Sequence, residues 1–432
     1  MPESMPESMP DLSPAIPVTC PFCGLLCDDV TVRASGAEIK VVDRGCAVSR
    51  RALEQNAPDL SPRIGGRAAG LDEAVAAAAA LLANARQPLI GGLATDVTGM
   101  RAVMSLADRI GAVLDHMNAP AKFRNLLAVQ EGGWITTTLA EVKNRADLVV
   151  LAGTDVVTRF PRFFERFVWT DETLFGLSSA QREVVYLGRD LDMAAGIAPD
   201  GRRPFQIPCD VVALGAAFGA LRALMAGREL QAETVAGVPM AQWRTLADKL
   251  KSARYAVVVW AAADFDFPHA ELTVRALCEL IKDLNRSTRA AGLPLGGSDG
   301  DFTADGVELW QTGFPFRTGF GSGVAEYDPQ RFATARLLAQ GEADALLWIA
   351  SFDERRAAPG SAVPTVVLGR PGMVCEREPE VFIPVGTPGV DHAGHLFRTD
   401  KVVMLPLRRL RESGLPSVAR VVAAIGEAIA PC

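Results

Sequence analysis

Hydrophobic and polar positions alternate with two different periods along most of this chain. Short apolar runs rich in β-branched residues predict buried strands, whereas apolar positions spaced three and four apart predict amphipathic helices. The two kinds of segment follow one another in turn, which is typical of mainly parallel sheets covered by helices on both faces. The predicted strands are 30–33, 39–42, 88–91, 112–114, 148–151, 183–187, 256–260, 345–349 and 363–368, and the predicted helices are 71–85, 98–110, 211–225, 241–251, 271–285 and 417–428.

Three segments show neither the strand period nor the helix period. Residues 1–17 repeat MPESMPES and add further prolines, which predicts a disordered tail. Prolines and glycines between residues 58 and 66 predict a linker, and the glycine- and aromatic-rich segment 291–320 predicts a long structured loop. We therefore expect the tail 1–17, a cysteine-bearing subdomain 18–57, a first α/β lobe 58–190, a second α/β lobe 191–370 interleaved with the first, and a C-terminal α/β return 371–432.

Composition and charge narrow the class of protein. A chain of 432 residues exceeds one compact core, and 49% hydrophobic residues can fill more than one. The net charge of −7 argues against a binder of nucleic acid or of membrane surfaces. The most apolar run, 74–83, is too short to cross a bilayer and follows two acidic residues. We expect a cytoplasmic protein, whose cysteines are metal ligands or reduced thiols rather than disulfides.

Four of the eight cysteines are close together in the sequence. Cys20, Cys23, Cys27 and Cys46 lie within VTCPFCGLLCDDV and DRGCAVS, where three share one tight loop and a predicted hairpin returns the fourth. Such spacing predicts a four-thiolate metal site, and both zinc and a 4Fe–4S cluster suit it. The alternative is four reduced thiols packed as small hydrophobic groups.

Several long blocks resemble the B subunit of formylmethanofuran dehydrogenase. These are CPFCGLLCDDV, LAEVKNRADLVVLAGTDVVTRFPRFFERF, WQTGFPF and VDHAGHLFRTD, which occur in the order seen in that family. The resemblance implies a molybdopterin-oxidoreductase-like fold of the formate dehydrogenase and DMSO reductase type, with multi-lobed parallel sheets and a small Cys-rich N-terminal subdomain. It also implies an iron–sulfur cluster on the four cysteines and a tungsten or molybdenum bis-pterin in a central cleft.

This chain departs from the family at the pterin metal. Counted without gaps from Asp115 and from Asn144, the family's Cys–His pair falls on Ala121 and Lys122. An alanine has no atom that can coordinate a metal, and a lysine ammonium would place a positive charge beside the positively charged metal. We therefore expect no molybdopterin and no redox catalysis by this chain. An active tungsten or molybdenum dehydrogenase subunit remains the alternative.

A scaffold of this kind without its metallopterin resembles the B subunit of bacterial formyltransferase/hydrolase complexes. The resemblance implies a subunit without its own active site, in a complex that converts formyl-tetrahydromethanopterin to formate during formaldehyde oxidation. It implies three partners, which are the metallo-hydrolase or A subunit, the C subunit, and the formyltransferase or D subunit. It further implies a shared methanofuran-type carrier with a polyglutamate tail.

A polyanionic tail requires several cations, since arginine binds carboxylates through two parallel hydrogen bonds. Lys122 and Arg124 lie in a segment that, in the family, is a loop facing the active-site cleft. Arg159, Arg162 and Arg166 have the spacing of one helix face, and Arg317 follows WQTGFPF. These six residues are the predicted carrier-binding set. The alternatives are that Lys122 reaches solvent from a filled cavity and that the three arginines form a solvated helix face.

Overall fold

The computed structural model describes residues 14–55 and 60–429. The chain forms two compact units that are interleaved along the sequence. The first contains the described residues up to Met117, Ser298–Leu396 and those from Met404 onward, and the second contains Asn118–Gly297 and Phe397–Val403. The sequence analysis divides the chain elsewhere, at residues 190 and 370. Periodicity identifies strands but does not indicate which strands share a sheet.

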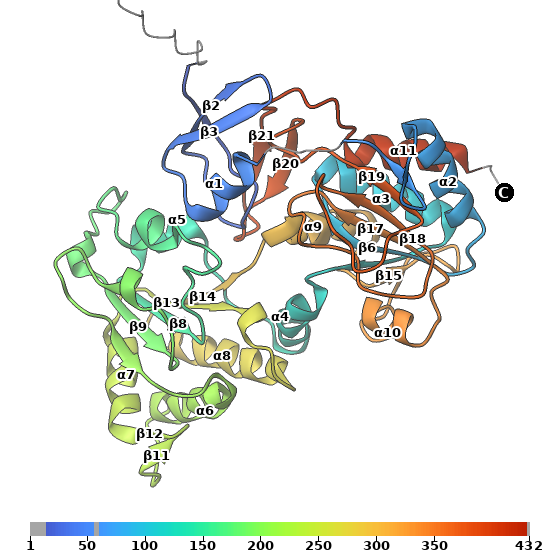
Figure 1. The fold of residues 1–432 in the computed structure, drawn as a ribbon. Coiled ribbons are helices and arrows are strands. Elements are labelled where there is room, and N and C mark those ends of the chain that lie inside the picture. Colours follow the sequence, from blue (N-terminus) through green and yellow to red (C-terminus); the bar gives the residue numbers. More distant parts are fainter. Residues whose placement is uncertain (1–13, 56–59, 430–432) are drawn as a thin grey trace, which may run out of the picture. The chain divides into compact units, whose positions relative to one another are not determined.

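The first unit is built on a nine-stranded sheet (Figure 1). Its five central strands are parallel, and antiparallel strands flank them at both edges. In spatial order the strands are β16 (Glu326–Tyr327), β15 (Thr318–Gly319), β7 (Val113–His116), β6 (Pro88–Ala94), β17 (Ala345–Ala350), β18 (Thr365–Gly369), β19 (Val381–Pro384), β4 (Arg63–Ile64) and β5 (Arg67–Ala68).

Strand β6 approaches the backbone of β17 closely at Gly92. A Cβ atom there would lie 2.4 Å from the carbonyl oxygen of Ile349, and Gly92 has a φ of +76°. The register of the two strands shifts between Trp348 and Ala350. Glycine at position 92 is therefore required for the parallel pairing.

Helices cover this sheet. Helix α11 packs against both α2 and α3, and those two helices contact the sheet. The opposite face buries Trp348, Phe382, Phe332 and Leu337. The helices of the unit are α1 (Ala47–Leu53), α2 (Leu71–Ala83), α3 (Val97–Ile110), α9 (Asp301–Thr312), α10 (Thr334–Ala339) and α11 (Val418–Ala428).

The cysteine-bearing segment forms a small antiparallel sheet within the first unit. Strand β2 (Val30–Ser35) pairs with both β1 (Ile16–Val18) and β3 (Glu38–Asp43), and α1 follows. The predicted tail thus ends before Ile16, because that residue already pairs with Val32. Its first thirteen residues lie outside the described part of the chain.

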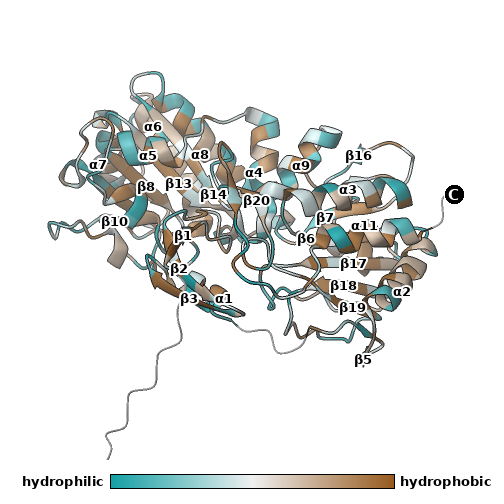
Figure 2. Cartoon of the chain, turned by 90° about the horizontal axis from the view of Figure 1, so that it is seen from above, coloured by the Kyte–Doolittle hydropathy of each residue, from teal (hydrophilic) through white to brown (hydrophobic). Residues whose placement is uncertain are grey.

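The second unit has a fully parallel five-stranded sheet in the order β10-β9-β8-β13-β14. In Figure 2 its strands are mainly brown, the colour of hydrophobic residues, and its helices carry both brown hydrophobic and teal hydrophilic residues. The strands are β8 (Leu148–Ala152), β9 (Glu183–Leu187), β10 (Phe205–Ile207), β13 (Ala256–Ala261) and β14 (Ala290–Leu295). The helices are α4 (Ala119–Gly132), α5 (Leu139–Arg145), α6 (Leu214–Met225), α7 (Met240–Ser252) and α8 (Ala270–Leu284).

The core of the second unit is centred on Trp260. This side chain is fully buried and donates from its indole Nε1 to Asn125 Oδ1 at 2.9 Å. Gly292 on the neighbouring strand leaves room for the ring, since a Cβ there would lie 2.8 Å from it. Two short hairpins complete the chain, β11 (Thr234–Val235) with β12 (Val238–Pro239) and β20 (Gly394–Phe397) with β21 (Met404–Leu407).

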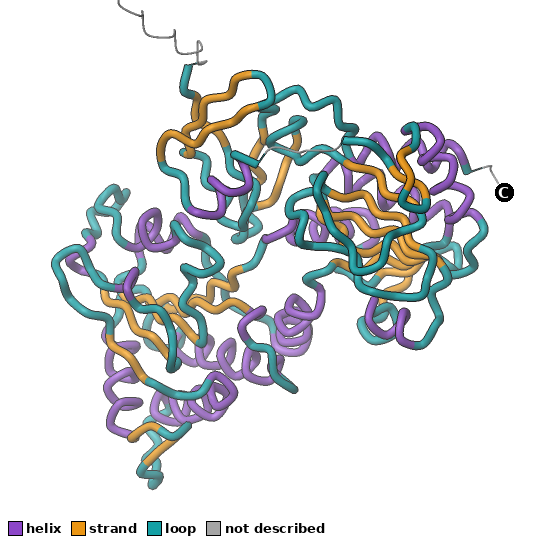
Figure 3. Tube along the Cα trace, viewed as in Figure 1, coloured by secondary structure: helices purple, strands orange, loops and turns teal. Residues whose placement is uncertain are grey.

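Two sequence predictions about loops are wrong. Segment 291–320 contains most of β14, all of α9 and then β15, and α9 is drawn as a helix in Figure 3. The buried face of α9 carries Asp301, Thr303, Asp305 and Glu308, so polar residues conceal its helical period. The described part of the predicted linker contains β4 and the turn that joins it to β5, where the glycines at 65 and 66 adopt positive φ.

Across the described residues, every helix is too short or too polar to span a membrane.

Candidate functional site

Two of the six predicted cations meet at the carboxyl edge of the second unit's sheet. Strand β13 is followed by a 3₁₀ turn, Ala262–Asp264, and by Asp266. Arg124, from α4, donates to the carbonyl oxygen of Ala262 at 2.7 Å and to Asp266 Oδ1 at 2.6 Å. Arg159 donates from Nε to Asp264 Oδ1 at 2.8 Å. The carboxyl edge is where open parallel sheets bind ligands, so both arginines occupy a suitable place.

Lys122 lies on α4 rather than on the predicted loop. Asn118 precedes the helix, and Pro120 occupies its first turn, where a missing N–H costs nothing. The prediction of a loop was wrong because the proline was not recognised as a helix start. Lys122 is only 7% exposed, and Ala121 beside it presents a methyl group. Lys122 is therefore largely withdrawn from solvent.

Arg162 and Arg166 do not share a straight α-helix with Arg159. The segment passes through turns into a π-helix, Phe164–Val168, so the expected one-face alignment is lost. Arg162 is 5% exposed and donates to Glu165 Oε1 at 2.5 Å. Arg166 is half-buried, with its guanidinium carbon 5.4 Å from the ring centroid of Phe167.

Arg317 belongs to the first unit and faces a buried carboxylate. Its Nε lies 3.3 Å from Asp115 Oδ1, at the end of β7, and the Asp115 side chain is only 3% exposed. Burial raises the pKa of Asp115, and the charge of Arg317 opposes that shift. Asp115 Oδ2 also accepts the backbone N–H of Thr334 at 2.7 Å. Arg317 thus holds a structural carboxylate in place.

A buried acidic pair on α9 lies near this carboxylate. Glu308 and Asp305 are both fully buried, and the hydroxyl of Thr318 lies 3.3 Å from Glu308 Oε2. Glu308 Oε1 has no hydrogen-bond partner among the described residues. Burial, followed by the charges of Asp305 and Asp115, raises the pKa of Glu308 well above its ordinary value. The sequence analysis missed this pair, since it expected a loop there.

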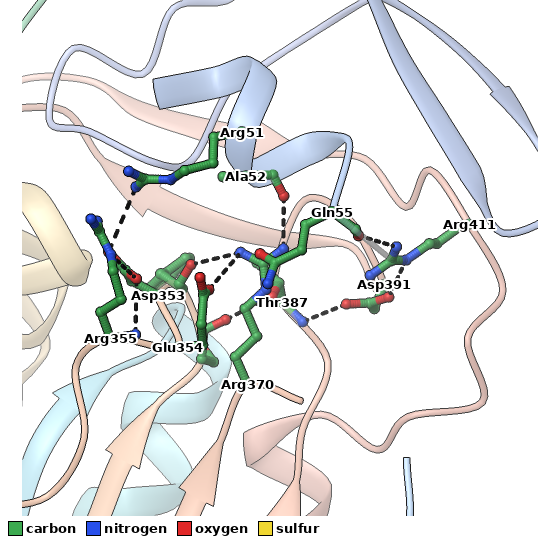
Figure 4. Close-up of polar contacts among 12 residues, drawn as sticks. Arg51, Ala52, Gln55, Asp353, Glu354, Arg355, Arg370, Thr387, Asp391 and Arg411 are labelled. Atoms are coloured by element: carbon green, nitrogen blue, oxygen red, sulfur yellow. Dashed lines mark hydrogen bonds and ion pairs between the residues drawn. The ribbon is translucent and has the colours of Figure 1, made fainter. Parts of the chain in front are cut away.

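A second feature missed from the sequence is an arginine pair at the carboxyl edge of the first unit's sheet (Figure 4). Arg370 follows β18, is 4% exposed, and donates to the carbonyl oxygens of Ala52 at 2.7 Å and Phe352 at 3.0 Å. Arg411 donates to Asp391 Oδ1 at 2.8 Å and to the carbonyl oxygen of Gln55 at 3.1 Å. Both arginines therefore bind the segment that follows the fourth cysteine to the edge of the sheet.

The four cysteines lie within electrostatic range of one another in the small antiparallel sheet region. Cys20, Cys23 and Cys27 are buried, and Cys46 is partly exposed. Burial is the main cause that raises the pKa of Cys20 well above its usual value and that of Cys23 to about 12. Cys46 Sγ accepts the N–H of Ser49 at 3.4 Å as the N-cap of α1.

The four thiols are the candidate ligands for the metal expected from the sequence. In the described part of the chain, no three His, Cys, Asp or Glu side chains are placed to share a metal ion. We therefore assign no chemistry to a metal here, and the zinc or 4Fe–4S site stays a prediction from the sequence.

Comparison with known proteins gives consistent results. A scan against protein-family models finds no match. The chain is 33% identical over 344 residues to the B subunit of the formyltransferase/hydrolase complex of Methylorubrum extorquens, which covers 78% of this chain and 88% of the relative. It is 26% identical over 416 residues to the B subunit of tungsten-containing formylmethanofuran dehydrogenase 2 of Methanocaldococcus jannaschii, covering 89% and 91%.

A solved structure supports the same relationship. A chain of the formyltransferase/hydrolase complex from Methylorubrum extorquens, determined with methylofuran, superposes with a TM-score of 0.70 at 30% identity, covering 85% of this chain and 98% of that one. The mixed α/β fold with parallel sheets is thus confirmed, as is the resemblance inferred from the sequence blocks. The chain belongs to the family of B subunits of formyltransferase/hydrolase complexes, which is related to the B subunits of formylmethanofuran dehydrogenases.

Proposed function

We propose that this chain is the scaffold and carrier-binding subunit of a formyltransferase/hydrolase complex. The observation that carries the proposal is the 33% identity to a B subunit of such a complex, across 88% of that relative's length. The assembly would convert formyl-tetrahydromethanopterin to formate in one-carbon oxidation. Its other members would be the metallo-hydrolase or A subunit, the C subunit, and the formyltransferase or D subunit, all acting in the cytoplasm.

The proposed chain has no active site of its own. The positions that correspond to the dehydrogenase Cys–His pair are Ala121 and Lys122, on the first turns of α4. Neither side chain can bind tungsten or molybdenum as a thiolate does. The lobes would retain the molybdopterin-oxidoreductase type of fold without the pterin, and the dehydrogenase remains the competing function because of the 26% identity to the tungsten enzyme.

The carrier would be a methylofuran-type molecule with a polyglutamate tail. Of the predicted cations, Arg124 and Arg159 are the best suited to hold carboxylates of that tail. Their present partners Asp266 and Asp264 have side chains 89% and 25% exposed, and ion pairs that reach solvent contribute only about 0–1 kcal/mol. A tail carboxylate can therefore replace them. Arg162 is less suited because its own side chain is only 5% exposed, and Arg317 is committed to buried Asp115.

The test is to purify the chain with its co-expressed partners. The expected results are formyl transfer and formate release only when all four subunits are present, a copurifying carrier identified by mass spectrometry, and no reduction of viologen dyes by formylmethanofuran. Stoichiometric tungsten or molybdenum with pterin in the assembly, together with viologen reduction, would establish the dehydrogenase instead.

A further inference from the structure

The second unit contains a basic pocket at the amino edge of its parallel sheet, opposite the edge that carries Arg124. The pocket has a volume of about 700 Å³, within the range of small-molecule sites. Its walls include Arg145 at the end of α5, Arg254 before β13 and Arg289 before β14. Three strand and helix ends therefore bring three guanidinium groups to one concave surface.

The charges of these arginines are not all balanced within the chain. Arg145 pairs with Glu141 at 2.8 Å. Asp147 accepts the backbone N–H of Arg254 at 2.8 Å rather than its side chain. Among the residues that the structure describes, neither the Arg254 nor the Arg289 guanidinium has an ion-pair or hydrogen-bond partner.

The carboxylates of Glu141 and Asp147 also line the pocket, and neutral groups provide the rest of its walls. The hydroxyl of Tyr255 donates to Thr137 Oγ1 at 2.9 Å, which leaves the threonine hydroxyl able to donate into the pocket. The ring of Phe175 lies 4.3 Å from the guanidinium carbon of Arg145 and is 60% exposed. The pocket thus combines three cations, two carboxylates, hydroxyls and an exposed aromatic face.

We propose that this pocket binds an anion carrying two or more carboxylate or phosphate groups, held by Arg254 and Arg289. A guanidinium is suited to such groups because its fork matches two oxygens at once. Because the exposed guanidinium groups of Arg254 and Arg289 lack partners among the described residues, an anion with more than one charged group can bind both, and the hydroxyl pair contacts its uncharged part. The site is separate from the carrier contacts of the proposed function, and its occupation does not depend on them.

Isothermal titration of the purified full-length chain tests the proposal, with citrate as a tricarboxylate probe and inorganic pyrophosphate as a phosphate probe, at ionic strength held constant with chloride. We expect one or both probes to bind, and binding to weaken at least tenfold in the Arg254→Gln/Arg289→Gln variant. The matched control is Arg244→Gln, an exposed arginine on α7 outside the pocket. The probe whose binding is lost identifies a carboxylate or a phosphate ligand.

Arginine modification gives a second measurement that needs no variant. The bound probe should protect Arg254 and Arg289 from phenylglyoxal in the wild-type chain, as mapped by peptide mass spectrometry, while Arg244 reacts as before. The proposal is overturned if neither probe binds, or if bound probe leaves Arg254 and Arg289 as reactive as in its absence. Unchanged binding in a folded double variant overturns it equally.

Discussion

Arg370 donates a hydrogen bond of 2.7 Å to the backbone carbonyl of Ala52, 318 positions earlier in the chain. The contact joins the residue after β18 to α1, the helix that Cys46 caps. Phe22, between the first two cysteines, lies under the same guanidinium at 5.7 Å. The cysteine-bearing segment is therefore attached to the sheet of its unit by a buried cation.

The first prediction concerns Arg370→Ala. The substitution removes the donors of two buried carbonyl oxygens, those of Ala52 and Phe352, and should lower the free energy of unfolding by about 2–4 kcal/mol in urea titration. The control is Arg377→Ala, whose side chain is 56% exposed and whose ion pair with Glu380 spans 3.5 Å. It should change stability by less than about 1 kcal/mol. Equal losses of unfolding free energy in the two variants would contradict the role of Arg370 in attaching the cysteine-bearing segment.

The second prediction is an energetic coupling between Arg411 and Asp391. Both side chains are nearly inaccessible, at 6% and 2% exposure. Arg411→Met leaves a buried carboxylate without its cation and should cost about 3 kcal/mol. Asp391→Asn in the same chain should restore part of this loss, so that a double-mutant cycle gives a coupling above about 1 kcal/mol. Additive losses would show that the pair contributes nothing as a pair.

The third prediction is a dependence of stability on pH from Glu308. Burial raises its pKa above the ordinary value of 4.5, so the folded chain binds more protons than the unfolded chain above that pH. Stability from this group is present below pH 4.5 and is lost as the pH rises through the folded-state pKa. Glu308→Gln removes the titration, and its unfolding free energy relative to wild type should rise with pH by up to about 1.4 kcal/mol per pH unit. Denaturant titrations of both chains between pH 5 and 9 measure the difference, and parallel curves would refute it.

The fourth prediction concerns carrier binding by Arg124 and Arg159. If these side chains exchange Asp266 and Asp264 for carboxylates of the carrier, each Arg→Gln substitution should weaken binding about tenfold, since a charge-assisted hydrogen bond contributes about 1.5–3 kcal/mol. The quantity to measure is carrier retained per assembly after gel filtration. Arg228→Gln, an exposed arginine beyond the end of α6, serves as the control. Undiminished carrier in the double variant would exclude this edge as the contact.

The strands were predictable from sequence because they are buried on both faces. Strands β8 and β13 are continuous apolar runs, LVVLA and AVVVWA, with every residue buried. Helix α9 was not predictable in the same way. Its buried face contains carboxylates and a threonine, and a helix with a polar buried side has no apolar period to detect.

The candidate site was predictable in its residue types but not in its pairings. Arginine content pointed to carboxylate binding, yet the sequence does not show that Asp115 lies against Arg317, 202 positions later. For the same reason Arg254 and Arg289 were overlooked, although they come together at the start of neighbouring strands. The fold determines which charged side chains neutralise one another, and the spacing of these residues along the sequence does not show it.

The last prediction separates two roles of Cys46. In the structure its sulfur caps α1 by accepting the N–H of Ser49, and a serine hydroxyl can make the same contact. We therefore expect Cys46→Ser to retain the wild-type free energy of unfolding within about 0.5 kcal/mol, and Cys46→Ala to lose about 1 kcal/mol. A metal ligand behaves differently, because neither side chain replaces a thiolate and the whole binding energy is lost. Parallel losses of several kcal/mol in both variants, accompanied by the disappearance of zinc or iron from elemental analysis, would establish the four-cysteine metal site.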